Sequence, residues 1–120
     1  MYTLILHPNL TPLKWAGYSK TQQVLMIANE LNRSLNALGI NRPEDAEKAY
    51  ERAMELTDLT IEDSRWWSNG LKELLRFREI LSELWLYKDM KLNRMCLTAL
   101  LSFDAEAWNM FVPVDPVAKN

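Results

Sequence analysis

Glycine and proline are scarce in this chain of 120 residues, which contains 3 Gly and 5 Pro. Sandwiches and barrels of many strands need frequent tight turns, and such turns depend on these two residues. Three scattered glycines also exclude the glycine-rich loops that bind phosphate groups. The composition therefore favours helices and argues against a nucleotide-binding loop.

Cysteine and histidine each occur once, as Cys96 and His7. One cysteine excludes an internal disulfide and indicates a reducing compartment, so we expect a cytoplasmic protein. Zinc sites need several Cys or His ligands. A catalytic triad would have to use His7, which precedes Pro8 and has no partner in view. We therefore expect no metal, no cofactor and no enzymatic activity.

Long hydrophobic runs and a strong net charge are also missing. No apolar run approaches the roughly 20 residues that cross a bilayer, and residues 1–8 lack the basic start of a signal peptide. The formal net charge is −2, which gives no general attraction for nucleic acid or anionic lipid. We expect no membrane association.

What the sequence does contain is apolar residues at helical spacing, in four stretches over about 19–38, 42–58, 61–88 and 90–111. Capping patterns begin the first three at Ser19, Asn41 and Thr60. Gly39 is expected to end the first helix in a left-handed conformation. Asn69-Gly70 and the segment 102–104 are expected to break the later stretches, and Thr11-Pro12 to start one helical turn.

These patterns predict an all-α fold, a bundle of four to five helices in a single domain over residues 1–120. Within it we expect an extended arm at 1–18, a helical core at 19–111 and a tail at 112–120. Short connections argue for antiparallel neighbouring helices. On the second helix the small residues Ala46, Ala49 and Ala53 allow a neighbouring helix to approach closely.

Charge is divided unevenly along the chain. Between residues 43 and 63 there are eight acidic and two basic residues, whereas 65–94 holds seven basic and four acidic residues. One interpretation is pairing between the two segments within the molecule. The alternative is a nucleic-acid-associated accessory protein, because aromatic residues interleave with cations in 65–94. Its basic face would consist of Lys72, Arg76, Arg78, Lys88, Lys91 and Arg94.

Five tryptophans are an unusual number for this length. Trp85 and Trp108 are predicted to fill the core. On a helix, Trp66 and Trp67 diverge by about 100°, so one neighbouring element cannot cover both. Because Trp and Arg are enriched at interface hot spots, we predict that Arg65, Trp66 and Trp67 form part of a partner-binding surface.

The N-terminal segment offers a second candidate surface. Tyr2, Leu4 and Leu6 lie on one side of an extended strand, and a second chain can satisfy such an edge. The leading prediction is therefore a small cytoplasmic helical protein that acts through protein–protein interaction, as an adaptor, a regulator or a homo-oligomeric unit.

Overall fold

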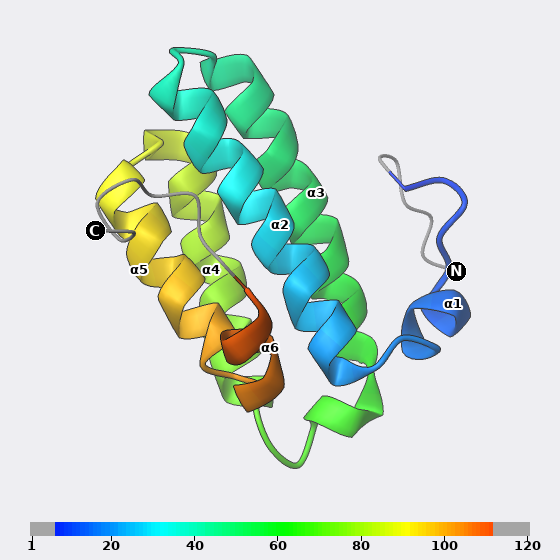
Figure 1. Ribbon diagram of the computed structural model, residues 1–120. Coiled ribbons are helices and arrows are strands. Elements are labelled where there is room, and N and C mark those ends of the chain that lie inside the picture. Colours follow the sequence, from blue (N-terminus) through cyan, green and yellow to red (C-terminus); the bar gives the residue numbers. More distant parts are fainter. Residues whose placement is uncertain (1–6, 112–120) are drawn as a thin grey trace.

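Helices account for most of residues 7–111, the part of the chain that the computed structural model describes (Figure 1). This part contains no strand, which confirms the all-α prediction. Two short helices at its ends bring the number of α-helices to six. In chain order the elements are α1 (Pro12–Ala16), α2 (Lys20–Gly39), α3 (Pro43–Glu62), the 3-10 helix η1 (Ser64–Trp66), α4 (Leu71–Tyr87), α5 (Met90–Leu101) and α6 (Ala105–Met110).

The four long helices, α2 to α5, form the body of the molecule (Figure 1). Helix α2 packs closely against α3 and also against α5, while α3 packs against α4. The contact between α4 and α5 is much less extensive. The bundle is therefore tight around α2 and α3 and looser between its last two long helices.

Helix α2 begins at the capping box that the sequence predicts. Backbone N of Gln22 donates to Ser19 Oγ over 3.1 Å, and backbone N of Ser19 donates to Gln22 Oε1 over 2.9 Å. Its predicted end is wrong, because Gly39 is the last helical residue and Asn41 takes the left-handed conformation with a φ of 58°. Asparagine tolerates this conformation, and the N-cap of α3 is Arg42 rather than the predicted Asn41.

Helix α3 continues to Glu62, so the predicted start of a new helix at Thr60 is wrong. The Thr60 hydroxyl instead donates to the carbonyl of Leu56 inside α3, over 2.8 Å. The break at Asn69-Gly70 is confirmed, with Gly70 at a φ of 109°.

The ends of the chain differ in how well they were predicted. Thr11 caps α1 through backbone N of Lys14, as the sequence predicts, and so the described part of the 1–18 arm is not extended. The break near 102–104 is confirmed, because Asp104 Oδ2 accepts a hydrogen bond of 2.9 Å from backbone N of Ala107 and starts α6. The predicted tail, 112–120, lies outside the described residues.

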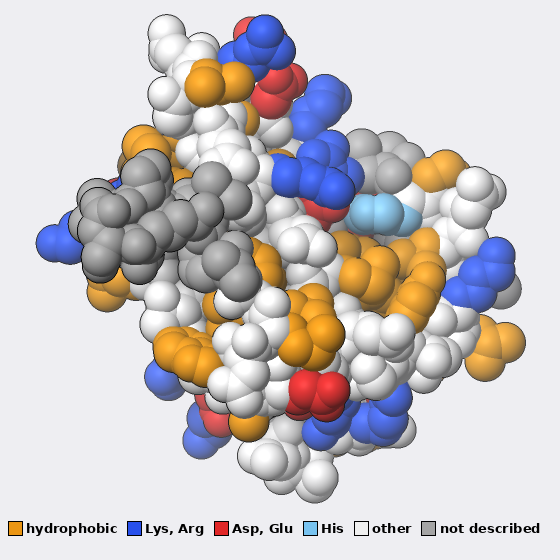
Figure 2. Space-filling view, viewed as in Figure 1, with side chains coloured by type: hydrophobic (Ala, Val, Ile, Leu, Met, Phe, Trp, Pro, Cys, Tyr) orange, Lys and Arg blue, Asp and Glu red, His pale blue; other side chains and the backbone are white. Residues whose placement is uncertain are grey.

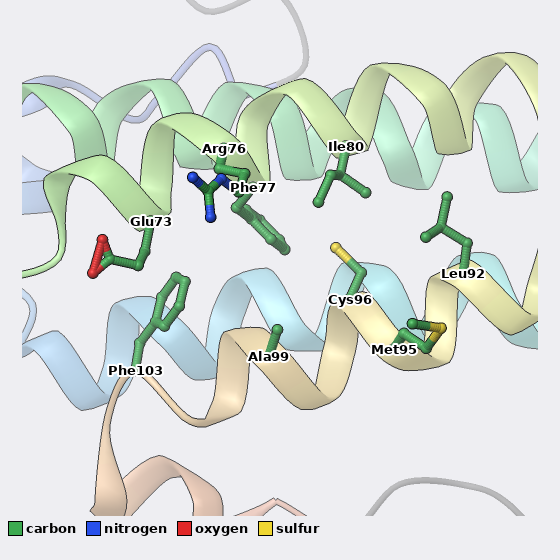
Figure 3. A pocket seen from close by; sticks show the side chains of 9 residues that line it. All are labelled: Glu73, Arg76, Phe77, Ile80, Leu92, Met95, Cys96, Ala99 and Phe103. Atoms are coloured by element: carbon green, nitrogen blue, oxygen red, sulfur yellow. The ribbon is translucent and has the colours of Figure 1, made fainter.

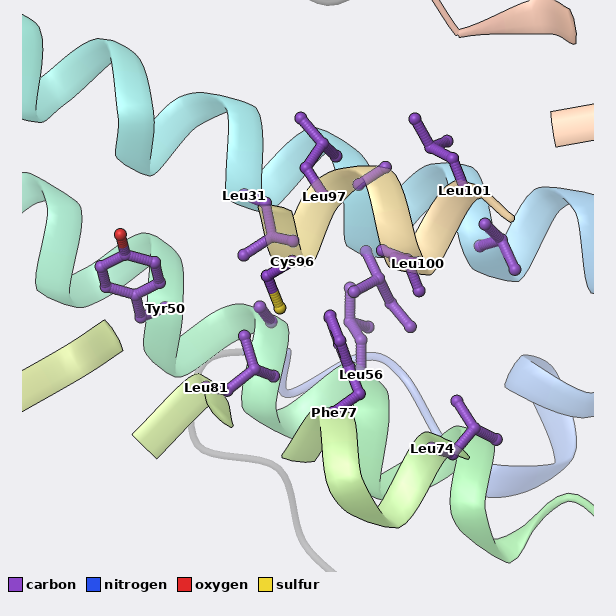
Figure 4. Packing of buried hydrophobic residues seen from close by; sticks show 14 of the residues in the cluster. Leu31, Tyr50, Leu56, Leu74, Phe77, Leu81, Cys96, Leu97, Leu100 and Leu101 are labelled. Atoms are coloured by element: carbon purple, nitrogen blue, oxygen red, sulfur yellow. The ribbon is translucent and has the colours of Figure 1, made fainter. Parts of the chain in front are cut away.

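A single apolar core is shared by all four long helices (Figure 4). On α3, Ala46 and Ala53 are fully buried, and their small size lets α2 lie close. Each fully buried large side chain contributes about 1.5–3 kcal/mol by removal of apolar surface from water. The largest of them include Ile27, Leu31, Leu56, Leu74, Leu81, Leu84 and Leu100.

One polar cluster crosses this core. Asn93 on α5 is fully buried, and its Nδ2 donates to Ser34 Oγ on α2 over 2.9 Å and to Tyr50 Oη on α3 over 2.7 Å. Burial raises the pKa of Tyr50 above its usual value, so its phenol stays protonated. These directional bonds define how α5 sits against α2 and α3.

Candidate functional site

An apolar groove runs between α4 and α5, where the bundle is loosely packed (Figure 3). Its volume is about 320 Å³. Figure 3 shows Phe77, Ile80, Leu92 and Cys96 around the groove, with Met95 on its α5 side. The residues that line it are Glu73, Arg76, Phe77, Ile80, Leu92, Met95, Cys96, Ala99 and Phe103.

Two sequence features produce this groove. The apolar positions of α4 cover more than one face, so Ile80 remains only partly buried after Leu81 and Leu84 enter the core. On α5, the positions that face α4 include the small residues Cys96 and Ala99, which leave space between the two helices. An edge-to-face contact between Phe77 and Phe103, with ring centroids 6.4 Å apart, bounds the groove at one end.

Beyond that end lies a second, more polar hollow of about 350 Å³. It shares Glu73 and Phe103 with the groove, so the two hollows adjoin. Lys20 Nζ sits 4.7 Å from the ring centroid of Trp66 in its wall. The combined depression therefore changes from apolar near Leu92 to polar near Lys20.

The chemistry available in the groove is limited. Burial raises the pKa of Cys96 to about 12, so its thiol is protonated and is a poor nucleophile near neutral pH. The ionisable residues lining it besides Cys96 are Glu73 and Arg76, both near the Phe103 end (Figure 3). In the described part of the chain no three His, Cys, Asp or Glu side chains gather as metal ligands would. The groove is suited to binding apolar groups.

The structure separates the predicted Arg65-Trp66-Trp67 surface into different environments. Trp66 is only 2% exposed and belongs to the core, so the proposal that it contacts a partner is corrected. Trp67 is 57% exposed, and its Nε1 donates to the carbonyl of Ile61 over 2.8 Å. As the diverging directions require, only one of the two indoles is covered.

Trp66 and Arg65 join a polar network that ties η1 to α1 and α2. Gln23 is fully buried, and its Nε2 donates to the carbonyl of Trp15 and to Asp63 Oδ2. Arg65 Nη2 binds Asp63 Oδ2 over 2.6 Å and the carbonyl of Tyr18 over 2.8 Å. The bonds from Arg65 and Gln23 lower the pKa of Asp63 to about 2. Arg65 and Trp66 therefore have a structural role, because they connect η1 with α1 and α2.

The other predicted sites also differ in outcome. Tyr2, Leu4 and Leu6 lie outside the described residues. Trp85 is half-buried and its Nε1 donates to Glu51 over 3.1 Å. Trp108 is 49% exposed, so its prediction as a core residue is wrong. It sits on the short helix α6, where Ala107 is the buried residue.

The cations of 65–94 do not form one continuous face. Arg78 points toward α3 and pairs with Asp58 over 2.7 Å, and Lys88 pairs with Glu47 over 2.8 Å. Arg76 lies on a different side of α4, at the groove. The pairing between the acidic and basic segments thus occurs within the molecule. On the face shown in Figure 2, Lys and Arg side chains are scattered.

The groove was not predicted from the sequence. Its apolar lining residues have the spacing of an ordinary core stripe, although Met95 among them is 60% exposed. The sequence did contain one indication of it: α4 has more apolar positions than a single buried face can accommodate.

Comparison with known proteins adds no assignment. No helix among residues 7–111 is both long and apolar enough to span a membrane. No protein-family model matches the chain, and neither a curated protein nor a solved structure was found to be similar to it.

Proposed function

We propose that this protein acts through protein–protein interaction, by binding the apolar side of a partner's helix in the groove between α4 and α5. The observation that carries the proposal is the groove itself, a hollow of about 320 Å³ whose lining is apolar except at one end. An amphipathic helix presents apolar side chains at every third and fourth position, and grooves between helices commonly accept such a row.

Two features favour a polypeptide over a small molecule. Sites for small ligands usually carry a few polar groups that converge on the ligand and orient it. Here Glu73 and Arg76 lie together at one end, and the stretch from Ile80 to Leu92 is lined by apolar groups. Met95 lines the groove and is 60% exposed, and Tyr87, which follows Ile80 by seven residues and so lies on the same side of α4, is 75% exposed. Exposed apolar patches of this kind mark interaction surfaces.

The proposal is one of binding without catalysis, in the cytoplasm. The protonated Cys96 thiol supports the absence of nucleophilic chemistry in the groove. A free, buried cysteine is also compatible with a reducing compartment.

Site-specific photo-crosslinking tests this proposal. A benzophenone amino acid replaces Met95 at the groove in one variant and Leu86 in a control variant. The two positions are matched because both native side chains are 60% exposed, while Leu86 is turned about 120° around α4 from Ile80 by helical spacing. Each full-length variant is expressed in the source cell and irradiated, and adducts are identified by mass spectrometry.

The expected result is a discrete polypeptide adduct at Met95 that is absent or much weaker at Leu86. A second variant with the crosslinker at Ala99 should capture the same polypeptide, because Ala99 lines the same groove. Absence of any polypeptide adduct at both groove positions would overturn the proposal, as would equal labelling at Leu86.

A further inference from the structure

The two sides of the groove carry opposite charges near the α4–α5 connection. Glu83 follows Ile80 by three residues and Arg76 by seven, so it lies on the groove side of α4. Lys91 precedes the groove residue Met95 by four and lies on the same side of α5. Both side chains are exposed. Near the connection the groove thus has an acidic residue on its α4 side and a basic residue on its α5 side.

Glu83 and Lys91 also lie at nearly the same level along the groove. Helices α4 and α5 are antiparallel neighbours joined by a short connection at Lys88 and Asp89. Figure 3 shows Glu73 opposite Phe103 and Ile80 opposite Cys96. Continuing this register toward the connection puts Glu83 within about one helical turn of the level of Lys91.

Neither Glu83 nor Lys91 pairs with an opposite charge within the described part of the chain. The cross-helix ion pairs of this region run to α3 from α4 and from the residue that follows it, as Arg78–Asp58 and Lys88–Glu47. Within residues 7–111, Glu83 and Lys91 form no ion pair with another side chain. They therefore remain available to an external partner.

We infer that the partner in the groove is a second copy of this chain, which rests on the proposed function and specifies its partner. A two-fold axis parallel to the groove places α4 of one copy over α5 of the other. The apolar linings then face each other and close into a four-helix arrangement. In such an isologous contact every interaction occurs twice. Glu83 of each copy meets Lys91 of the other, giving two symmetric ion pairs.

The cationic residue Arg76 at the groove does not oppose this arrangement. Opposite Arg76, the outward positions of α5 are the neutral residues Thr98, Ala99 and Ser102. No like charge therefore faces Arg76 across the interface. The opposite charges of Glu83 and Lys91 make this end of the face complementary to itself, whereas a partner of one charge would be attracted by one of these residues and repelled by the other.

Charge exchange with measurement of mass in solution tests this inference. Size-exclusion chromatography with light scattering should give twice the chain mass of 14.0 kDa for the wild-type protein. Glu83→Lys and Lys91→Glu should each weaken the dimer by about tenfold or more, because each change turns two attractive pairs into two repulsive ones. An equimolar mixture of the two variants should form a heterodimer, and the double variant should regain the wild-type mass.

Two control variants carry the same changes away from the groove. Glu62→Lys and Lys48→Glu lie on exposed positions of α3, and both should leave the mass unchanged. Far-UV circular dichroism confirms that each variant is folded.

The outcomes separate this inference from the proposed function. If the wild-type protein is a monomer at all concentrations, the second copy is overturned as partner. The same holds if Glu83→Lys and Lys91→Glu both leave the dimer mass unchanged. If the chain is monomeric while the crosslinker at Met95 captures a different polypeptide, the proposed function stands and only its partner changes. If the crosslinker captures no polypeptide, both are overturned.

Discussion

The indole Nε1 of Trp66 donates a hydrogen bond of 2.9 Å to Oε1 of Gln23, and both side chains are buried. The same glutamine reaches the carbonyl of Trp15 and the carboxylate of Asp63. One polar side chain on α2 thus links α1, the end of α3 and η1. These elements precede the break at Gly70, so the link positions the segment from which α4 starts.

Replacement of Gln23 by Met should destabilise the protein by about 2–4 kcal/mol. The change keeps the size of the side chain but leaves the Trp66 N–H buried without its acceptor, at about 1–3 kcal/mol. It also removes the hydrogen bonds from Gln23 to Asp63 and to the Trp15 carbonyl, at about 0.5–1.5 kcal/mol each, although that carbonyl keeps its bond from backbone N of Tyr18. Urea unfolding gives the free energy of unfolding. The control is Asn29→Met at an exposed position of α2, which should change it by less than about 0.5 kcal/mol. Equal losses in the two variants would contradict the structural role of Gln23.

The two adjacent tryptophans should differ sharply in their effect on stability. Trp66→Ala removes a buried ring and should lower the free energy of unfolding by about 3–5 kcal/mol. Trp67→Ala removes a side chain that is 57% exposed and should cost less than about 1 kcal/mol. Chemical denaturation followed by circular dichroism measures both. A Trp67 variant as unstable as the Trp66 variant would show that the second indole is also part of the core.

Much of the fold could be predicted because the relevant signals are local. The capping box at Ser19 and Gln22 acts over three residues, and the break at Asn69-Gly70 needs only the conformational freedom of glycine. The errors arose where two local signals compete. Gly39 and Asn41 both permit a left-handed turn, and the chain uses Asn41.

The candidate site was harder to predict, because it depends on how two helices diverge. The residues that line the groove have the same apolar spacing as a buried stripe. Whether Ile80 and Cys96 meet another helix or a gap is decided by the packing of α4 on α3 and of α5 on α2. The Asn93 contacts to Ser34 and Tyr50 contribute to that packing, and they join residues 43 to 59 positions apart. Contacts between residues so far apart cannot be predicted from a short sequence pattern.

Two glycines should respond to alanine with opposite signs. Gly70 has a φ of +109°, and a Cβ built on it would lie 3.0 Å from Cε3 of the Trp66 ring. Gly70→Ala should therefore lower the free energy of unfolding by about 2 kcal/mol or more. Gly39 is helical with open space around it, so Gly39→Ala should raise the same quantity by up to about 1 kcal/mol. Thermal and urea unfolding report both changes, and a shift of the same sign in the two variants would contradict the assigned backbone conformations.

Asp63 should make stability depend on pH in the acidic range. Its pKa is lowered to about 2 in the folded protein, against about 3.9 in an unfolded chain. The ionised carboxylate therefore stabilises the fold by about 1–2 kcal/mol above pH 4, and this contribution is lost as the pH falls from about 4 toward 2. Asp63→Asn should be less stable than wild type at pH 7, with a gap that narrows at pH 3.

The matched control is Asp45→Asn, which also removes a carboxylate beside an arginine. Asp45 and Arg42 are both well exposed and 3.6 Å apart, so this variant should stay close to wild type at every pH. Urea unfolding at pH 7, 4 and 3 compares the three proteins. A constant gap between wild type and Asp63→Asn would show that the Asp63 carboxylate keeps the same pKa in both states.

The reactivity of Cys96 reports on the integrity of the groove. The thiol is 4% exposed and its pKa is raised to about 12 by burial, so very little thiolate is present at pH 8. Its reaction with an aromatic disulfide reagent should be at least about a hundredfold slower than that of an exposed thiol of pKa about 8.5. The exposed reference is a Ser68→Cys variant that also carries Cys96→Ser. The rate at Cys96 should keep rising from pH 8 to 10, because the thiolate fraction grows about tenfold per pH unit below the pKa, whereas the reference should level off near pH 9. A fast reaction at Cys96 with the same plateau would mean that α4 and α5 separate in solution and expose the side chains between them.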